Sequence, residues 1–282
     1  MKRTQRDLAD LSRDMADLIK TLAGRGETVF GVDRLPAPPN LEARPTSGLR
    51  APPPGNEPQR PTEATPTADS PQPTAPGPAP AADLPRGIKD LAAKAASCTR
   101  CGLSSRRTHV VFSDGTGASG LMLIGEGPGQ NEDQTGVPFV GRAGKLLDRM
   151  IAAAGFQRNA LYITNIVKCR PPQNRDPLPE EIQSCRPYLN RQVEALTPKV
   201  VVAMGRPSAQ SLLRTDLPLS RLRGRVHSLA GIPLVVTYHP AYLLRSPAQK
   251  ARAWEDWRRI RDLLARVHAG ETVPVDGEDV PL

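Results

Sequence analysis

Aromatic residues and long apolar runs are scarce in this sequence. Only 4% of its 282 residues are Phe, Trp or Tyr. No apolar run is as long as the roughly 20 residues that a membrane-spanning helix needs, which excludes such a helix. The first residues, MKRTQRDLADLSRDM, carry too many charges for a signal peptide. We therefore expect no membrane association and an intracellular, cytoplasmic location.

Cysteine is also rare, and the common nucleotide-binding motifs are absent. The four cysteines of an intracellular chain are more often ligands than disulfide partners. The glycine-rich segment 125–129, GEGPG, is not followed by Gly-Lys-Ser/Thr and so is not a P-loop. It also differs from the glycine fingerprint of dinucleotide-binding folds. These absences remove the most familiar explanations for a glycine-rich turn.

Proline is abundant by contrast, and its distribution divides the chain. Sixteen of the 31 prolines lie between Asp33 and Pro85, in a stretch without apolar periodicity. Such a stretch has too little apolar surface to offset the entropy cost of ordering it. The sequence therefore predicts four segments: an amphipathic N-terminal helix (1–32), a Pro/Ala-rich disordered linker (33–82), a folded domain (83–270) and an acidic C-terminal tail (271–282).

The expected N-terminal helix has an apolar face of its own. Between residues 4 and 24, apolar residues recur at three- and four-residue steps. One isolated helix cannot bury such a stripe. We expect it to pack on the folded domain, on a second copy or on a protein partner, and we otherwise expect a monomer.

Positive charge is concentrated in the expected folded domain. Residues 83–270 hold 28 Lys and Arg against 15 Asp and Glu, whereas the last twelve residues hold four acids and no base. A basic domain suits a polyanionic partner, because Lys and Arg at phosphates release condensed counterions. A generally basic surface without that role explains the composition equally well.

Short, nearly continuous apolar runs alternate with helical patterns after residue 84. Such runs are typical of buried parallel strands. The alternation predicts an α/β fold, in which helices cover both faces of a parallel sheet. Ligands of such sheets bind beyond the carboxyl ends of the strands, so the residues after each run are candidates for a site. The expected strands are 121–126, 161–167, 199–205 and 233–239, and the expected helices lie near 142–154, 178–196, 206–214 and 248–268.

Chemically informative residues follow these runs. Glu126 lies in the glycine-rich turn, where a carboxylate can hold a water molecule or act as a base. Asn165 carries a donor and an acceptor on one plane, which matches the edge of a nucleobase; capping of a turn is the alternative. His239 can donate a hydrogen bond to developing negative charge. Phe139 lies in a loop, where it stacks on a base or only anchors the loop.

The cysteines form a second candidate site. Cys98 and Cys101 make a Cys-x-x-Cys pair, and 15 residues separate Cys169 from Cys185. Four thiolates can hold either a [4Fe–4S] cluster or zinc. Zinc ribbons usually carry two such pairs, which slightly favours the cluster. A thioredoxin-like pair would follow a strand, whereas this one follows a helical stretch, 88–96.

Taken in order, these elements resemble the family 4 uracil-DNA glycosylases, which contain iron and sulfur. The resemblance covers about residues 84–265. It is carried by Cys98-x-x-Cys101, GEGPG (125–129), NEDQTGVPFVGRAGKLLD (131–148), ITNIVKCRPP (163–172), Cys185 and YHPAYLLR (238–245). It implies a three-layer α/β/α sandwich with a short central parallel sheet, a structural [4Fe–4S] cluster on the four cysteines, and excision of uracil from DNA at the nucleoid.

The resemblance also implies catalytic roles. Glu126 and the backbone of Gly127 would position the attacking water. Asn165 would pair with the edge of a uracil that has been flipped out of the DNA. His239 would hydrogen-bond uracil O2 as negative charge develops on the leaving base. No metal would take part in this chemistry.

Three further residues are implied in substrate binding. Phe139 would stack on the flipped uracil. Glu132 would stand near C5 of the base and help to exclude the methyl group of thymine. Arg245, at the end of the last motif, would contact the substrate. The cluster would order the loops that carry its cysteines.

Two other functions fit the residues without the resemblance. A non-catalytic nucleic-acid-binding protein with a structural metal site would leave Glu126 and His239 without a role. A nucleotide-binding enzyme would use segment 125–129 as a phosphate cradle. A covalently trapping relative of the family carries a basic, histidine-containing insertion before the fourth cysteine, whereas residues 170–184 contain no histidine. Simple hydrolysis is therefore predicted.

Overall fold

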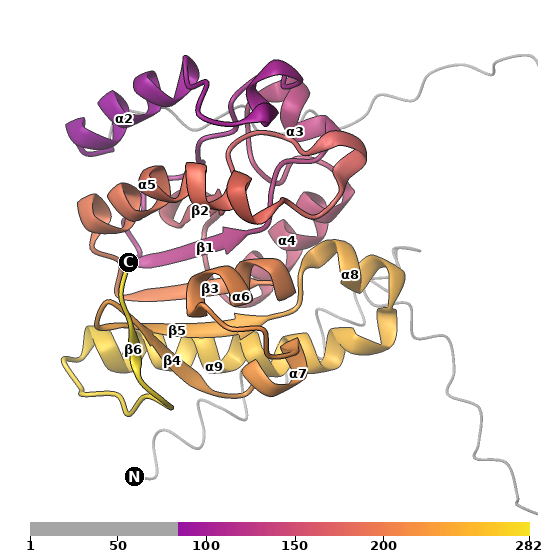
Figure 1. The fold of residues 1–282 in the computed structure, drawn as a ribbon. Coiled ribbons are helices and arrows are strands. Elements are labelled where there is room, and N and C mark those ends of the chain that lie inside the picture. Colours follow the sequence, from indigo (N-terminus) through magenta and orange to yellow (C-terminus); the bar gives the residue numbers. More distant parts are fainter. Residues whose placement is uncertain (1–83) are drawn as a thin grey trace, which may run out of the picture. The chain divides into compact units, whose positions relative to one another are not determined.

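The structure, a computed structural model, describes residues 84–282. The helix expected in 1–32 and the linker expected in 33–82 lie outside the described residues, so both stay predictions. Within the described range, no helix is long and apolar enough to cross a membrane. This range holds one six-stranded sheet between two layers of helices (Figure 1). The predicted three-layer α/β/α fold is confirmed.

The four expected strands form the parallel part of the sheet. They pair in the order β2-β1-β3-β5, and each pair is parallel. Their sequences are apolar at nearly every position because helices cover both faces of these strands. Their carboxyl ends therefore meet at one edge of the sheet. The bounds are β1 (Leu121–Gly125), β2 (Tyr162–Asn165), β3 (Val200–Met204) and β5 (Ile232–Thr237).

Two edge strands were not expected. β4 (Val226–Leu229) runs antiparallel to β5 through the turn Ala230-Gly231, where both residues have positive φ, as in a tight hairpin turn. β6 (Asp279–Val280) then pairs with β4. The Asp279 carboxylate accepts a hydrogen bond from the Gly231 N–H at 2.9 Å. The acidic tail, expected only as a charged segment, thus completes the sheet.

Alternate residues of the strands face opposite helical layers. Leu121 and Leu123 of β1 pack in a core with α4, α8 and α9, whereas Met122 and Ile124 pack with α2, α5, α6 and α7. Each face is thereby buried by apolar helical residues. The helices are α2 (Arg86–Ala96), α4 (Arg142–Ala153), α5 (Pro179–Leu196), α6 (Arg206–Leu213), α7 (Leu219–Leu222), α8 (Pro240–Arg245) and α9 (Lys250–His268).

Short helical segments lie in the loops between the longer elements. The short helix α3 follows the glycine-rich turn and has only polar residues. Because it lacks apolar periodicity, the sequence did not predict it. The remaining segments are single turns of 3-10 helix. Their bounds are α3 (Gln130–Thr135), η2 (Gly102–Ser105), η3 (Arg158–Ala160), η4 (Pro172–Asn174) and η5 (Pro247–Gln249).

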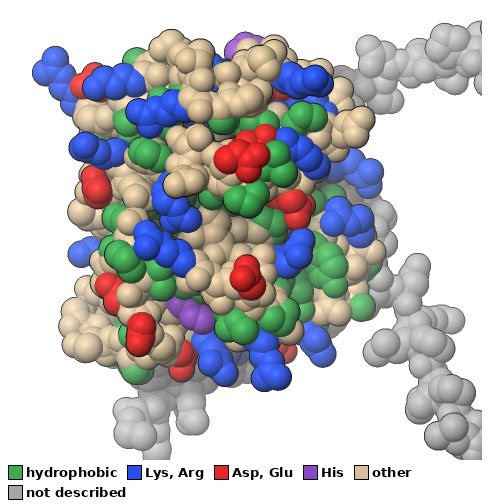
Figure 2. Space-filling model, viewed as in Figure 1, with side chains coloured by type: hydrophobic (Ala, Val, Ile, Leu, Met, Phe, Trp, Pro, Cys, Tyr) green, Lys and Arg blue, Asp and Glu red, His purple; other side chains and the backbone are tan. Residues whose placement is uncertain are grey.

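The basic excess is spread over the surface. In the view of Figure 2, Lys and Arg side chains are scattered across the face, with fewer Asp and Glu between them. Residues 83–270, which carry the excess of 28 bases over 15 acids, account for nearly all of the described range. Such a surface attracts a polyanion over a broad area.

Candidate active site

Three of the predicted residues meet at the carboxyl ends of β1, β2 and β5. In the sheet, Asn165 lies beside Gly125. The ring centroids of Phe139 and His239 are 5.5 Å apart. A side chain in place of Gly125 would collide with Asn165 Oδ1 and would come within 2.5 Å of Phe139 Cζ. Gly125 therefore keeps open the contact between the amide and the aromatic ring.

Asn165 has a buried acceptor without a partner. Its side chain is buried, and Oδ1 accepts no hydrogen bond from the described residues. An unmade hydrogen bond at a buried polar atom costs about 1–3 kcal/mol. The backbone of Asn165, by contrast, has a partner: its carbonyl oxygen accepts a hydrogen bond from Lys168 Nζ at 2.8 Å. The amide oxygen is thus held in place and free to accept an N–H from a ligand.

The Phe139 loop is held by charged groups from elsewhere in the chain. Arg158 donates from Nη2 to the Pro138 carbonyl at 2.7 Å, while its Nε binds Asp114 at 2.8 Å and its Nη1 binds Asp148 at 2.6 Å. Phe139 itself is buried and has a φ of 55°, which non-glycine residues rarely adopt. The ring is therefore fixed by the loop's geometry.

Glu132 links two loops of the site by hydrogen bonds. Its Oε1 accepts hydrogen bonds from the Val140 and Gly141 N–H groups at 2.9 Å, and its Oε2 accepts from the Gly129 N–H at 3.1 Å. The carboxylate therefore links the glycine-rich turn to the Phe139 loop. It also occupies an N–H group that a phosphate would need, which disfavours the phosphate-cradle alternative. Its expected place near C5 of uracil stays a prediction.

His239 is held as a neutral imidazole with one defined donor. It caps helix α8, and its Nδ1 accepts from the Ala241 N–H at 3.2 Å. The ring proton is consequently on Nε2. Burial, together with the positive charge of Arg245, lowers the pKa of His239 to about 4. At neutral pH the ring can donate from Nε2 without carrying a charge.

The strand end before His239 is anchored by a buried ion pair. Asp256 of α9 accepts from Thr237 Oγ1 at 2.8 Å and from Arg223 Nε at 2.8 Å. The Arg223 guanidinium also lies 4.0 Å above the centroid of the Tyr238 ring. These contacts fix the two residues that precede the histidine.

Glu126 follows β1 and lies partly buried. Burial, together with the neighbouring Asp176 carboxylate, raises the pKa of its carboxyl group to about 7, although the positive charge of Arg206 acts in the opposite direction. The next residue, Gly127, is packed closely, because a Cβ there would lie 2.9 Å from Val167 Cγ2. Arg245 is exposed at the end of α8, so its contact with substrate stays a prediction.

The four cysteines lie around one hollow on the α2 and α5 side of the sheet. Cys98, Cys101, Cys169 and Cys185 all line it. Cys169 Sγ accepts from Arg107 Nη1 at 3.2 Å, and Cys185 Sγ accepts from the backbone N–H of Lys168 at 3.3 Å. Burial raises the pKa of the Cys185 thiol to about 11. Four cysteines from separate segments of the chain therefore lie together, whereas their role as ligands stays a prediction.

The chemistry of this donor set can be compared with that of a metal centre. Within the described residues, no group of three or more His, Cys, Asp or Glu side chains is arranged to hold a metal ion. Four cysteines around one hollow are nevertheless the donor type that binds either an iron–sulfur cluster or tetrahedral zinc.

The chain is similar in sequence to known uracil-DNA glycosylases. Residues 112–260 match the model of the Uracil DNA glycosylase superfamily. Type-4 uracil-DNA glycosylases from Archaeoglobus fulgidus, Sulfurisphaera tokodaii and Thermotoga maritima are 39%, 39% and 40% identical to this chain. The alignments cover 64%, 62% and 57% of this chain and 94%, 84% and 85% of those proteins.

The chain belongs to the uracil-DNA glycosylase superfamily. Its relatives place it among the type-4 members, as the motifs predicted. The superfamily match contains Glu126, Asn165 and His239, whereas Cys98 and Cys101 precede it. The family assignment rests on the sequence, whereas the proximity of Asn165, Phe139 and His239 is an observation of the structure.

Sequence reasoning missed several residues that shape the site of this superfamily member. Arg158 carries no motif signal, because its partners come from three separate segments. Gly144 was noticed only as part of a motif, yet a Cβ there would collide with the Phe139 carbonyl. Asp176 and Arg206 are also brought to Glu126 only by the fold.

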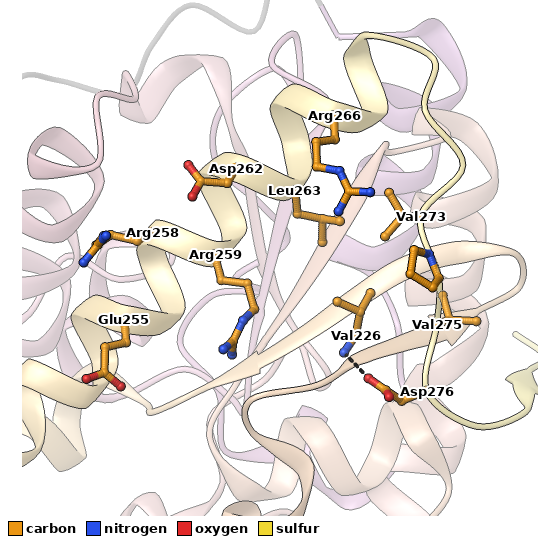
Figure 3. A pocket seen from close by; sticks show the side chains of 11 residues that line it. Val226, Glu255, Arg258, Arg259, Asp262, Leu263, Arg266, Val273, Val275 and Asp276 are labelled. Carbon is orange, nitrogen blue, oxygen red and sulfur yellow. Dashed lines mark hydrogen bonds between the residues drawn. The ribbon is translucent and has the colours of Figure 1, made fainter. Parts of the chain in front are cut away.

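A separate pocket lies between α9 and the C-terminal segment (Figure 3). Arg258 and Arg266 line it together with Val273 and Val275. None of the predicted site residues lines this pocket. We therefore place the candidate active site at the strand ends.

Proposed function

We propose that this chain removes uracil from DNA by hydrolysing the N-glycosidic bond, which leaves an abasic site. The observation that carries the proposal is the buried, unpaired Oδ1 of Asn165 beside Phe139 and His239. Uracil presents an N3–H donor, which this acceptor would receive. Cytosine presents an unprotonated N3 instead, so it would leave the acceptor unpaired. The names of the type-4 relatives support the same substrate.

The base must leave the DNA helix before it can reach these residues. Flipping costs a few kcal/mol, which binding in the site offsets. The fixed ring of Phe139 would stack on the flipped base, while Asn165 would pair with its edge. The scattered Lys and Arg of the surface would hold the phosphates.

Bond cleavage then places charge where the site has a donor. The electron pair of the bond between C1′ and N1 leaves with uracil, and the Nε2–H of neutral His239 would donate to O2 of the resulting anion. Water attacks C1′, and the ionised carboxylate of Glu126 would hold this water and accept its proton. A neutral histidine suits this role because it remains a donor without protonating the base.

Incubation with a uracil-containing oligonucleotide tests the proposed function. Free uracil and strand scission after alkali treatment are expected. The same oligonucleotide with thymine in place of uracil should remain intact. Binding of the uracil oligonucleotide without release of the base would support the non-catalytic alternative instead.

We also propose that Cys98, Cys101, Cys169 and Cys185 hold a structural [4Fe–4S] cluster. The shared hollow, the hydrogen bonds to two of the sulfurs and the resemblance of the cysteine pattern to that of the family support it. When bound, the cluster would tie the segment after α2 to the loop after β2 and to α5. It would order these loops and take no part in cleavage.

The bound metal is expected to be iron. The protein purified without oxygen should be brown, with about four irons and four sulfides per chain. Metal analysis and visible absorption measure this directly. Stoichiometric zinc with no iron would contradict the cluster. A Cys185→Ser variant should lose thermal stability, whereas Ser184→Ala, its neighbour, should keep both stability and iron.

A further inference from the structure

Lys168 is a buried lysine that the mechanism above does not use. It is only 2% exposed, although lysine is almost never fully buried unless its charge is paired. In the part of the chain that the structure describes, no ion pair includes this residue. A buried charge without a carboxylate partner is costly, and an apolar side chain of similar length would fill the same space. Packing alone therefore does not explain a lysine at this position.

The ammonium group of Lys168 binds the end of strand β2. Its Nζ donates to the backbone carbonyl of Asn165 at 2.8 Å and to Thr164 Oγ1 at 2.5 Å. The Thr164 hydroxyl in turn donates to the Phe112 carbonyl at 2.8 Å. The ammonium also lies 5.8 Å from the centroid of the Phe112 ring. These contacts hold the backbone at the residue that carries the unpaired amide oxygen.

The backbone of Lys168 is anchored among the cysteines. Its N–H donates to Cys185 Sγ at 3.3 Å, and its carbonyl oxygen accepts from the Val111 N–H at 2.8 Å. Lys168 and the adjacent Cys169 both line the hollow that the four cysteines share. One residue thus contacts the cysteine hollow through its backbone and Asn165 through its side chain.

The two residues between Asn165 and Lys168 are fixed as well. The Ile166 N–H donates to the Gly125 carbonyl at 3.0 Å, and the Val167 N–H donates to the Glu126 carbonyl at 3.2 Å. The side-chain oxygen of Asn165 has no such partner. Its position therefore follows from packing and from the backbone that Lys168 holds.

We propose that Lys168 is a positioning residue, which holds the backbone of Asn165 from the cysteine hollow so that Oδ1 meets the N3–H of uracil. This proposal rests on the proposed function. Lys168 is buried beneath the strand end and does not touch the base or the DNA phosphates. A displacement of about 1 Å in a positioned group can slow a reaction about a hundredfold, so a buried charge at this point has a catalytic use.

Single-turnover uracil release by a Lys168→Met variant tests the proposal. Methionine keeps a long, unbranched side chain and removes the ammonium. The full-length, cluster-loaded protein should release uracil about ten- to a hundredfold more slowly than the parent. Its iron content should match that of the parent, and its affinity for the same oligonucleotide with thymine should stay within about twofold. Lys199→Met, which replaces an exposed lysine directly before β3, is the control and should behave like the parent.

Thermal unfolding separates positioning from support of the fold. Removing a costly buried charge offsets the loss of its two hydrogen bonds, because both the charge and its partners are buried. The midpoint of unfolding should consequently stay within about 4 °C of the parent, which corresponds to about 1 kcal/mol for a chain of this size. A merely structural lysine would lower this midpoint in step with the rate.

A double-mutant cycle shows whether Lys168 acts through Asn165. Effects of independent residues multiply to within about twofold, whereas residues that act as a unit do not. Beside Asn165→Ala, the change Lys168→Met should therefore slow release by no more than about twofold. The rates of the parent, of both single variants and of the double variant are measured under the same conditions, with protein in saturating excess over DNA.

The outcomes separate this proposal from the proposed function. A parental rate in Lys168→Met, or an undiminished effect beside Asn165→Ala, would overturn the positioning role. Loss of iron in proportion to activity would overturn it too, because Lys168 would then support the cysteine site alone. If Lys168→Met does not fold, Lys168→Gln, which keeps an uncharged donor, enters the same cycle and decides. A parent protein that releases no uracil refutes the proposed function instead.

Discussion

Replacing His239 by asparagine is expected to slow single-turnover uracil release by roughly a hundred- to a thousandfold. Removing one donor to a developing anion typically costs about 3–4 kcal/mol. The imidazole Nε2–H is that donor, because Nδ1 is already occupied by the Ala241 N–H. Asparagine is a good N-cap, so its Oδ1 should keep helix α8 capped, while its shorter side chain leaves no donor at the position of the imidazole Nε2. DNA affinity should change by much less than the rate.

The measurement compares release rate and DNA affinity on the same preparation. His268→Asn, at the exposed end of α9, is the matched control and should behave like the parent. Because burial depresses the pKa of His239 to about 4, its neutral form predominates down to about pH 5. Loss of activity between pH 8 and pH 6 is therefore assigned to Glu126. A parental rate in His239→Asn would show that the site is wrongly placed.

Replacing Asn165 by alanine should also abolish most of the activity, but with an unusual effect on stability. The variant loses the group that pairs with uracil, and we expect the release rate to fall at least a hundredfold, as for loss of a positioned donor or acceptor. The lost acceptor was buried and unpaired in the free protein. Its removal relieves about 1–3 kcal/mol of unmade hydrogen bonding, which offsets the lost packing.

Thermal unfolding and single-turnover rates together check this expectation. The free energy of unfolding should stay within about 1 kcal/mol of the parent, while the rate falls. Asn159→Ala provides the control, since this asparagine is exposed and outside the site. A variant that loses stability and activity in proportion would indicate that Asn165 supports the fold and does not recognise the base.

The sequence predicted the centre of the sheet well and its edge poorly. The runs that became β1 and β3 are apolar on both faces, a pattern that few other structures share. β4 has the mixed sequence Val-His-Ser-Leu, and β6 has two residues, so neither carries a periodic signal. Edge strands depend on pairing with a neighbour, which a local pattern does not contain.

Some residues of the candidate site could likewise be predicted from the sequence, whereas others could not. Asn165 and His239 could be found because ligands of parallel sheets bind where strands end. The cysteines could be found because thiolates at such spacings have few other uses inside cells. Asp176 and Arg158 could not, because each acts through partners far away in the chain. Glu132 was identified, but its three backbone hydrogen bonds were not foreseeable from its motif.

The central claim is that the buried Oδ1 of Asn165 receives the N3–H of uracil. The most direct measurement compares single-turnover release of uracil and of 3-methyluracil from otherwise identical single-stranded DNA. Methylation removes the N3–H and leaves the N-glycosidic bond in place. The account predicts fast release of uracil and no measurable release of 3-methyluracil. Release of both bases at similar rates would contradict it.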